Sequence, residues 1–239
     1  MALNPNTQQN ARGYAASTTF DAGLQAHMQK VYGVMSMGLV VTGLIAFGVA
    51  QSETLINLIF NTAFKWVAIF APLAIVWFGF SPARAAKMNK GTLRGIFYLL
   101  AAMYGLTFAS IFLIFTQESI ARVFFITAGM FAGMSLWGYT TKKDLSGMGS
   151  FLMMGLIGII IASVVNIFLG STLVHFMVSI LGVGIFTLMT AFDTQRIKET
   201  YAYANGHDAN DKMATLGALS LYLNFILLFQ SLMQLFGER

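Results

Sequence analysis

Hydrophobic residues along the 239-residue chain gather into seven long runs, with short polar connections between them. The runs cover residues 31–50, 63–80, 96–115, 123–139, 151–169, 173–192 and 213–236. Each is close to the length of about 20 apolar residues that an α-helix needs to cross a bilayer. The pattern therefore predicts an all-α polytopic membrane protein with seven transmembrane helices. Pro72 lies inside the second run and predicts a kink there, because proline has no backbone N–H to donate.

The segment before the first run is polar and rich in Asn, Gln, Thr and Ala. We interpret residues 1–28 as a flexible cytoplasmic tail and residues 29–239 as the seven-helix transmembrane domain. The first apolar run is too long for the hydrophobic core of a cleavable signal peptide, so we expect no such peptide here.

Composition supports the membrane class and excludes several others. Hydrophobic residues make up 57% of the chain and charged residues 10%, against roughly 45–50% and about 25% in an ordinary soluble domain. This balance excludes a soluble enzyme, a disordered regulator and a nucleic-acid-binding module. The absence of cysteine excludes disulfides, cysteine–metal sites and thiol catalysis. The three histidines are scattered and form no metal or catalytic motif, so we expect neither an enzyme nor a resident cofactor.

Basic residues orient the predicted bundle. They gather in the connections after the second, fourth and sixth runs, namely Arg84, Lys87, Lys90 and Arg94, then Lys142 and Lys143, then Arg196, Lys198 and Lys212. Cytoplasmic connections carry an excess of Lys and Arg. All three connections lie on one side only if the number of spans is odd, which predicts a cytoplasmic N-terminus and an external C-terminus.

The seventh run carries one polar stripe, formed by Ser220, Asn224, Ser231 and Gln234. At about 100° per residue these four side chains fall within an arc of roughly 80°. Lipid cannot satisfy polar groups, so the stripe should face the interior of the bundle. Two interpretations stay open: the stripe forms interhelical hydrogen bonds, or it lines a pathway, with Ser220, Ser231 and Gln234 among the lining residues.

Asp193 is the carboxylate nearest a hydrophobic run, since it directly follows Phe192. One interpretation is an interfacial residue at a helix end, solvated or paired with Arg196 three positions later. The other is an ion or proton site at the cytoplasmic mouth of the bundle, because ionisable groups at membrane depth commonly mark ion pathways.

Four segments, 105–110, 131–146, 192–197 and 218–229, resemble motifs of the Bax inhibitor-1 family of membrane proteins, in particular its bacterial inner-membrane branch. The similarity covers essentially everything after the tail. The resemblance implies a seven-helix fold in which the last helix is surrounded by the other six. It also implies a pH-sensitive calcium leak through the bundle.

The resemblance further implies a sensor made of two aspartates and a basic residue. Asp193 matches the first aspartate, and Arg84 is the best match for the basic residue. The second aspartate falls at Asn224, which is not a carboxylate. An amide removes the repulsion between two close carboxylates and one formal charge for calcium, so Asp193 is at most a weak calcium ligand. We expect weaker calcium binding and a blunted pH response near neutrality, both strengthened by Asn224→Asp.

The resemblance also implies a second function. Some bacterial relatives are associated with restraining a membrane-anchored ATP-dependent protease, which would make this protein a non-enzymatic modulator of a membrane partner. The tail over residues 1–28 would then serve as the handle for the protease, whereas a leak needs Asp193 and the polar stripe. Another transport or stress role remains as a further alternative. The expected partners are the lipid bilayer, transient calcium ions and this protease, and no nucleic acid.

Overall fold

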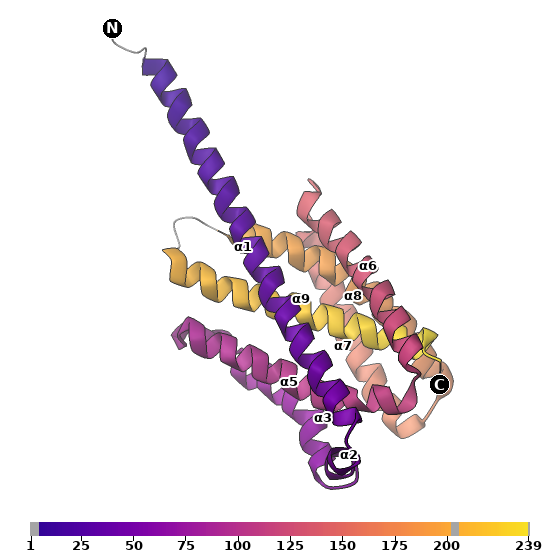
Figure 1. Ribbon diagram of the computed structural model, residues 1–239. Helices are drawn as coiled ribbons and strands as arrows, with labels where there is room; N and C mark the ends of the chain where they lie inside the picture. Colours follow the sequence, from indigo (N-terminus) through magenta and orange to yellow (C-terminus); the bar gives the residue numbers. More distant parts are fainter. Residues whose placement is uncertain (1–4, 202–205, 239) are drawn as a thin grey trace.

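The computed structural model describes residues 5–201 and 206–238, and its elements are helical throughout these ranges (Figure 1). In chain order they are α1 (Pro5–Ala50), α2 (Glu53–Phe60), α3 (Phe64–Ala74), the π-helix η1 (Ile75–Gly79), α4 (Pro82–Lys87), α5 (Lys90–Ile114), α6 (Gln117–Thr140), α7 (Ser146–Leu169), α8 (Thr172–Thr200) and α9 (Gly206–Phe236).

Six of these helices are long and apolar enough to cross a membrane: α1 from Ala22 onward, α5, α6, α7, α8, and α9 from Asp208 onward. The second predicted run is different. It forms α3 and η1, and it qualifies only together with α2, from which it is bent by 75°. The described chain therefore has six candidate spans, or seven if the bent pair counts as one. The prediction of exactly seven transmembrane helices is not confirmed, because the helix from Phe64 to Gly79 is shorter than the roughly 20 residues a full span needs.

Pro72 has the local effect that its chemistry predicts. Without an N–H, it leaves the carbonyl of Ala68 without its partner in the helix. Thr107 of α5 fills the gap, and its Oγ1 donates to that carbonyl at 2.7 Å. The helix then widens into η1 three residues after the proline. The hydrogen bond from Thr107 thus links α3 to α5 at the proline.

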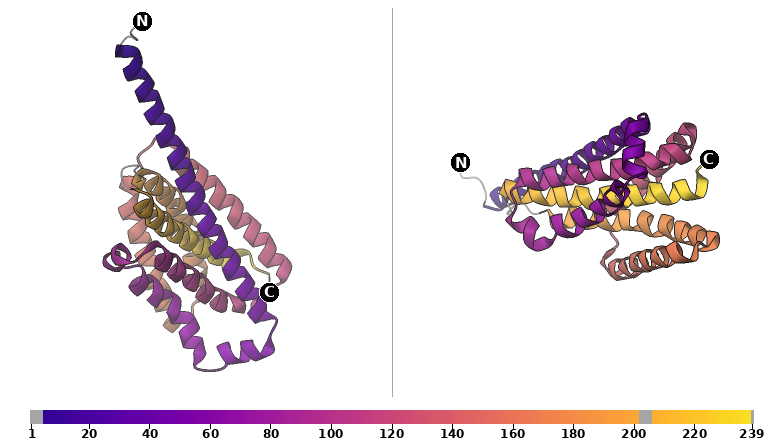
Figure 2. Two further views of the ribbon diagram at one scale, coloured as in Figure 1. Left: turned by 60° about the vertical axis from the view of Figure 1, so that its left-hand side comes forward. Right: turned by 90° about the horizontal axis from the view of Figure 1, so that it is seen from below.

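The first helix passes through the predicted boundary between tail and domain. α1 runs unbroken from Pro5 to Ala50, and its first part extends away from the bundle (Figures 1 and 2). Leu24, His27 and Met28 are already buried against other helices. The packed part of α1 therefore begins before residue 29. The flexibility of residues 1–28 stays a prediction.

The last helix is the most enclosed of the candidate spans. In α9, 72% of the apolar window is buried, against 6–33% in the other spans. It packs on α8, α1, α6 and α5 (Figure 2). Tyr222 of α9 is fully buried, and its hydroxyl lies 2.7 Å from Oγ1 of Thr42, which in turn lies 2.9 Å from the carbonyl of Ala101. This chain of hydrogen bonds joins α9, α1 and α5 in the apolar core.

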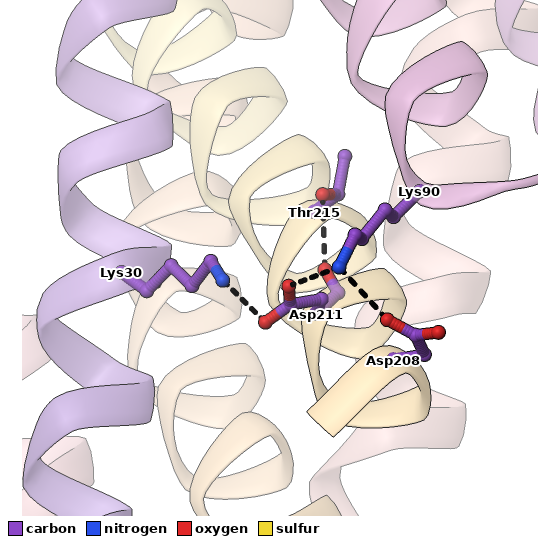
Figure 3. Close-up of polar contacts among 5 residues, drawn as sticks. All are labelled: Lys30, Lys90, Asp208, Asp211 and Thr215. Atoms are coloured by element: carbon purple, nitrogen blue, oxygen red, sulfur yellow. Dashed lines mark hydrogen bonds and ion pairs between the residues drawn. The ribbon is translucent and has the colours of Figure 1, made fainter. Parts of the chain in front are cut away.

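Charged groups hold α9 at both of its ends. At its start, Asp211 pairs with Lys30 of α1, while Nζ of Lys90 of α5 lies 2.8 Å from Asp208 and 3.7 Å from Asp211 (Figure 3). We call these four residues the N-terminal network of α9. Just beyond the end of the helix, Glu238 pairs with Arg122 of α6 at 2.6 Å.

Candidate functional site

Asp193 of α8 and Asn224 of α9 form a buried pair. Nδ2 of Asn224 donates to Oδ2 of Asp193 at 2.7 Å, and the two residues are only 6% and 3% exposed. No cation of the described chain lies within ion-pair distance of Asp193. The amide hydrogen bond is therefore the specific interaction that holds this carboxylate inside the bundle.

The end of α8 is fixed from the side of α6. Gly138 of α6 lies directly against the backbone of Ala191, so the two helices approach closely just before Asp193. One turn away on α6, Ser135 lies 3.0 Å from Oγ1 of Thr194 and 2.6 Å from the hydroxyl of Tyr32. These contacts set the rotation of α8 that turns Asp193 toward α9.

Gln195 fixes the same end of α8 to the connection between α6 and α7. Its Oε1 accepts from the backbone N–H of Leu145, and its Nε2 donates to the carbonyl of Lys143, each at 2.8 Å. Nζ of Lys198 adds a bond of 2.9 Å to the carbonyl of Tyr139. These hydrogen bonds hold the part of α8 that carries Asp193 against the end of α6 and the connection that follows it.

A cavity of about 160 Å³ reaches Asp193 of this pair. It is lined by His27, Asp193, Arg196, Ile197, Thr200, Met213, Leu216, Gly217 and Ser220. Arg196 and Thr200 are exposed, so they mark the end that opens to solvent, whereas Asp193 and His27 are buried at the inner end. An ion or a water molecule entering this cavity meets the Asp193 carboxylate.

The residues of the polar stripe of α9 lie in two different surroundings. Ser220 lines the cavity with Asp193, and Asn224 binds Asp193 directly. Near the other end of the helix, Gln234 accepts a hydrogen bond of 2.7 Å from Ser179 of α8. Ser231 is bonded to the Leu227 carbonyl of its own helix at 2.8 Å. Gln234 therefore joins α8 and α9, and it also lines a separate cavity of about 260 Å³. The pathway-lining roles of Ser220, Ser231 and Gln234 stay predictions.

Arg84 is not brought to the pair. It is exposed on the short helix α4 and donates to the carbonyl of Phe78 at 3.2 Å. The cation that shares the cavity with Asp193 is Arg196, one turn later on α8. The expected pairing of Arg84 with the sensor is absent from this structure. Its role in sensing stays a prediction.

Sequence reasoning missed His27, which was assigned to the tail. Its ring packs against Tyr201 with 5.2 Å between ring centroids. A signal was present, because Leu24, Met28, Val31 and Met35 recur at helical spacing and continue the apolar face of α1 backward through this position. The N-terminal network was missed as well, since its members lie in three separate segments of the chain.

The residues could hold calcium only loosely. Calcium takes six to eight oxygen ligands, and among the described residues no group of three or more His, Cys, Asp or Glu side chains gathers at one place. A cation in the cavity beside Asp193 would have that carboxylate as a charged protein ligand and would keep water for most of the rest.

Comparison with known proteins places this chain in a family. The family described as "Inhibitor of apoptosis-promoting Bax1" matches the chain over residues 24–239. The chain belongs to the Bax inhibitor-1 family. The match begins at Leu24, which is buried and is the first buried residue among those of α1 whose burial is described, from Ala22 onward.

Bacterial members of the Bax inhibitor-1 family are similar over nearly the whole chain. Inner membrane protein YbhL of Escherichia coli (strain K12) is 44% identical over 221 residues, which cover 91% of this chain and 94% of that protein. An uncharacterized protein of Rickettsia prowazekii is 42% identical over 221 residues, covering 92% and 93%. An uncharacterized membrane protein of Streptococcus pyogenes is 34% identical over 224 residues, covering 92% and 96%.

Proposed function

We propose that this Bax inhibitor-1 protein is a pH-sensitive calcium leak of the bacterial inner membrane, with Asp193 and Asn224 as a modified sensor pair. The observation that carries the proposal is the Asn224–Asp193 hydrogen bond at the inner end of a solvent-accessible cavity. In this proposal α2, α3 and η1 together form the second of seven spans. The N-terminus is cytoplasmic and the C-terminus external, as the basic connections indicate.

The proposal rests on the cost of a charge inside a bilayer. Ionisable residues at membrane depth are rare, and they commonly mark ion pathways because their burial is expensive. Asp193 lies at the contact between α8 and α9. Among the described helices, this contact is second in extent to the contact between α1 and α5. Its hydrogen bond to an amide stabilises the ionised carboxylate without neutralising it. In its ionised form this carboxylate attracts a cation that enters the cavity.

The leak should respond only weakly to pH near neutrality. A pair of carboxylates titrates in coupled steps that move one of them toward neutral pH, but Asn224 does not titrate. We expect purified protein in sealed liposomes to pass calcium well above protein-free liposomes, with a change of less than about threefold between about pH 6.5 and pH 8. Calcium uptake followed by an entrapped fluorescent indicator measures this. Uptake equal to that of protein-free liposomes at every pH would contradict the proposal.

A second candidate function is modulation of a membrane-anchored ATP-dependent protease. The observation that favours it is the first part of α1, which extends beyond the bundle and offers a helical handle (Figure 1). We expect removal of residues 1–20, which keeps the buried part of α1 from Leu24 onward, to leave calcium flux intact and to abolish inhibition of the protease. Degradation of a membrane substrate in reconstituted liposomes measures the inhibition. Loss of flux in this truncated protein would contradict the separation of the two roles.

A further inference from the structure

His27 occupies a position between two cavities at the start of α9. One is the 160 Å³ cavity that contains Asp193. The other, of about 470 Å³, is lined by Gly23, Ala26, His27, Lys30, Tyr201, Gly206, Asn210 and Asp211. His27 is the residue these two linings share. His27 is 6% exposed, and yet it borders both of these cavities.

Charged groups from three segments surround this imidazole. Lys30 lies one turn further along α1 and pairs with Asp211 of α9, so both belong to the N-terminal network (Figure 3). Asp193 and Arg196 of α8 face it across the smaller cavity, and no hydrogen bond or ion pair of the described chain joins it to either. The remaining titratable neighbour is Tyr201, whose ring packs on the imidazole.

We infer that His27 is a proton-binding site that controls the N-terminal network of α9. A ring nitrogen of the imidazole takes a proton from hydronium that reaches the larger cavity: an O–H bond of the hydronium breaks, an N–H bond forms, a water molecule is left, and the side chain becomes a cation. Histidine is the side chain whose ordinary titration range lies nearest neutral pH. The inference extends the proposed pH-sensitive leak by naming a titrating group where Asn224 cannot serve.

Protonation of His27 creates repulsion between two positive charges, those of His27 and Lys30. A buried imidazolium repels the ammonium group one turn away and competes with it for the carboxylate of Asp211. The Lys30–Asp211 pair is only partly enclosed, with side chains 36% and 20% exposed, so water can separate it at modest cost. Acidification therefore loosens α1 from α9 at the end of the bundle where the Asp193 cavity lies.

A distance measurement between α1 and α9 tests this inference without any ion flux. The chain contains no cysteine, so Gln25→Cys and Ala209→Cys supply the only two sites for spin labels. We expect the distance between the labels to increase by about 2 Å or more, or its distribution to broaden, when the pH falls from about 8 to about 5.5. His27→Gln should remove this change. Asp211→Asn should give the loosened distance at both pH values.

Two other histidines provide the matched controls. His175 lines a separate cavity with Gln234, so His175→Gln should keep the full response. His207 adjoins Asp208 in the sequence, and His207→Gln should keep it too. For the unsubstituted network, about 1 M salt shortens the screening length to roughly 3 Å and should loosen α1 at neutral pH.

Three results would overturn the inference: no pH response in the labelled parent, a response that survives His27→Gln, or a response lost in His207→Gln. Because the measurement needs no calcium, it separates this inference from the leak. A His27-dependent distance change in a protein that passes no calcium would reject the leak and retain His27 as the sensor. Calcium flux without the distance change would retain the leak and reject His27 as the sensor.

Discussion

Asp193→Asn is expected to lower calcium flux at least about tenfold, close to the level of protein-free liposomes. The substitution keeps the size of the side chain and removes its charge. A unit charge about 4 Å away contributes about 4 kcal/mol at an effective dielectric constant of 20, and a third of that energy already changes an equilibrium tenfold. Asp193 is the carboxylate that lines the 160 Å³ cavity, so no neighbouring acid of that lining replaces it.

Asp144→Asn is the matched control for this prediction. Asp144 is exposed in the connection between α6 and α7, and its carboxylate accepts a hydrogen bond of 2.8 Å from the N–H of Ser146. Hydrogen bonding by Ser146 lowers the pKa of Asp144 below its ordinary value, so the group stays charged at every pH at which flux would be measured. Flux should be unchanged in this variant. Equal losses in the two variants would indicate a general surface-charge effect and would count against the site.

Gly138→Leu is expected to cause the largest loss of stability. A Cβ atom at Gly138 would overlap the backbone of Ala191, and backbone cannot move aside as a flexible side chain can. Overpacking of this kind costs about 1–3 kcal/mol, and occasionally more. Separation of α6 from α8 would also break the Ser135–Thr194 contact beside Asp193. Thermal unfolding of the purified protein in detergent, followed by circular dichroism, measures the loss.

Gly133→Leu controls for adding a large side chain to the same helix. Gly133 is exposed, and a Cβ atom there would have no heavy atom within 4 Å. We expect its unfolding temperature to stay near that of the parent. Similar losses in both variants would mean that the close contact of α6 and α8 is not what makes Gly138 necessary.

Much of the site could be predicted from the sequence because its chemistry is local to two helices. The stripe on residues 220–234 indicates which face of the last helix is polar. Because lipid cannot form hydrogen bonds with polar groups, this face is expected to point into the bundle. Asp193 follows directly on an apolar run, so its carboxylate lies near the end of a span. The contact between Asp193 and Asn224 joins these two features, and the structure shows it.

The features that could not be predicted depend on how distant segments meet. Hydropathy recognises the apolar run over 63–80, but it does not show that this helix is short and bent from α2 by 75°. The ion pair between Lys30 and Asp211 joins residues 181 positions apart, and no periodicity in either segment predicts it. Arg84 was assigned to the sensor by alignment alone, and the geometry of α4 directs it to the carbonyl of Phe78 instead.

The polar N-terminal segment misled the assignment for a different reason. The composition of this stretch predicts exposure to solvent, because it contains the polar residues Gln25, His27, Gln29 and Lys30. Read as a helix, the same stretch has an apolar face, with Leu24 at 7% and Met28 at 4% exposed. His27 and Lys30 lie within one turn of that face, where they meet α8 and α9.

The most direct test of the central claim is calcium flux through a protein in which the pair is exchanged. The double variant Asp193→Asn with Asn224→Asp keeps one carboxylate and one amide at the same place. The carboxylate is then carried by α9 and the amide by α8. Our account predicts that Asp193→Asn alone abolishes flux and that the exchanged pair restores at least about half of it, because the cation responds to the charge in the cavity and not to the helix that carries it. An exchanged pair as inactive as Asp193→Asn, or full flux in Asp193→Asn, would contradict the account.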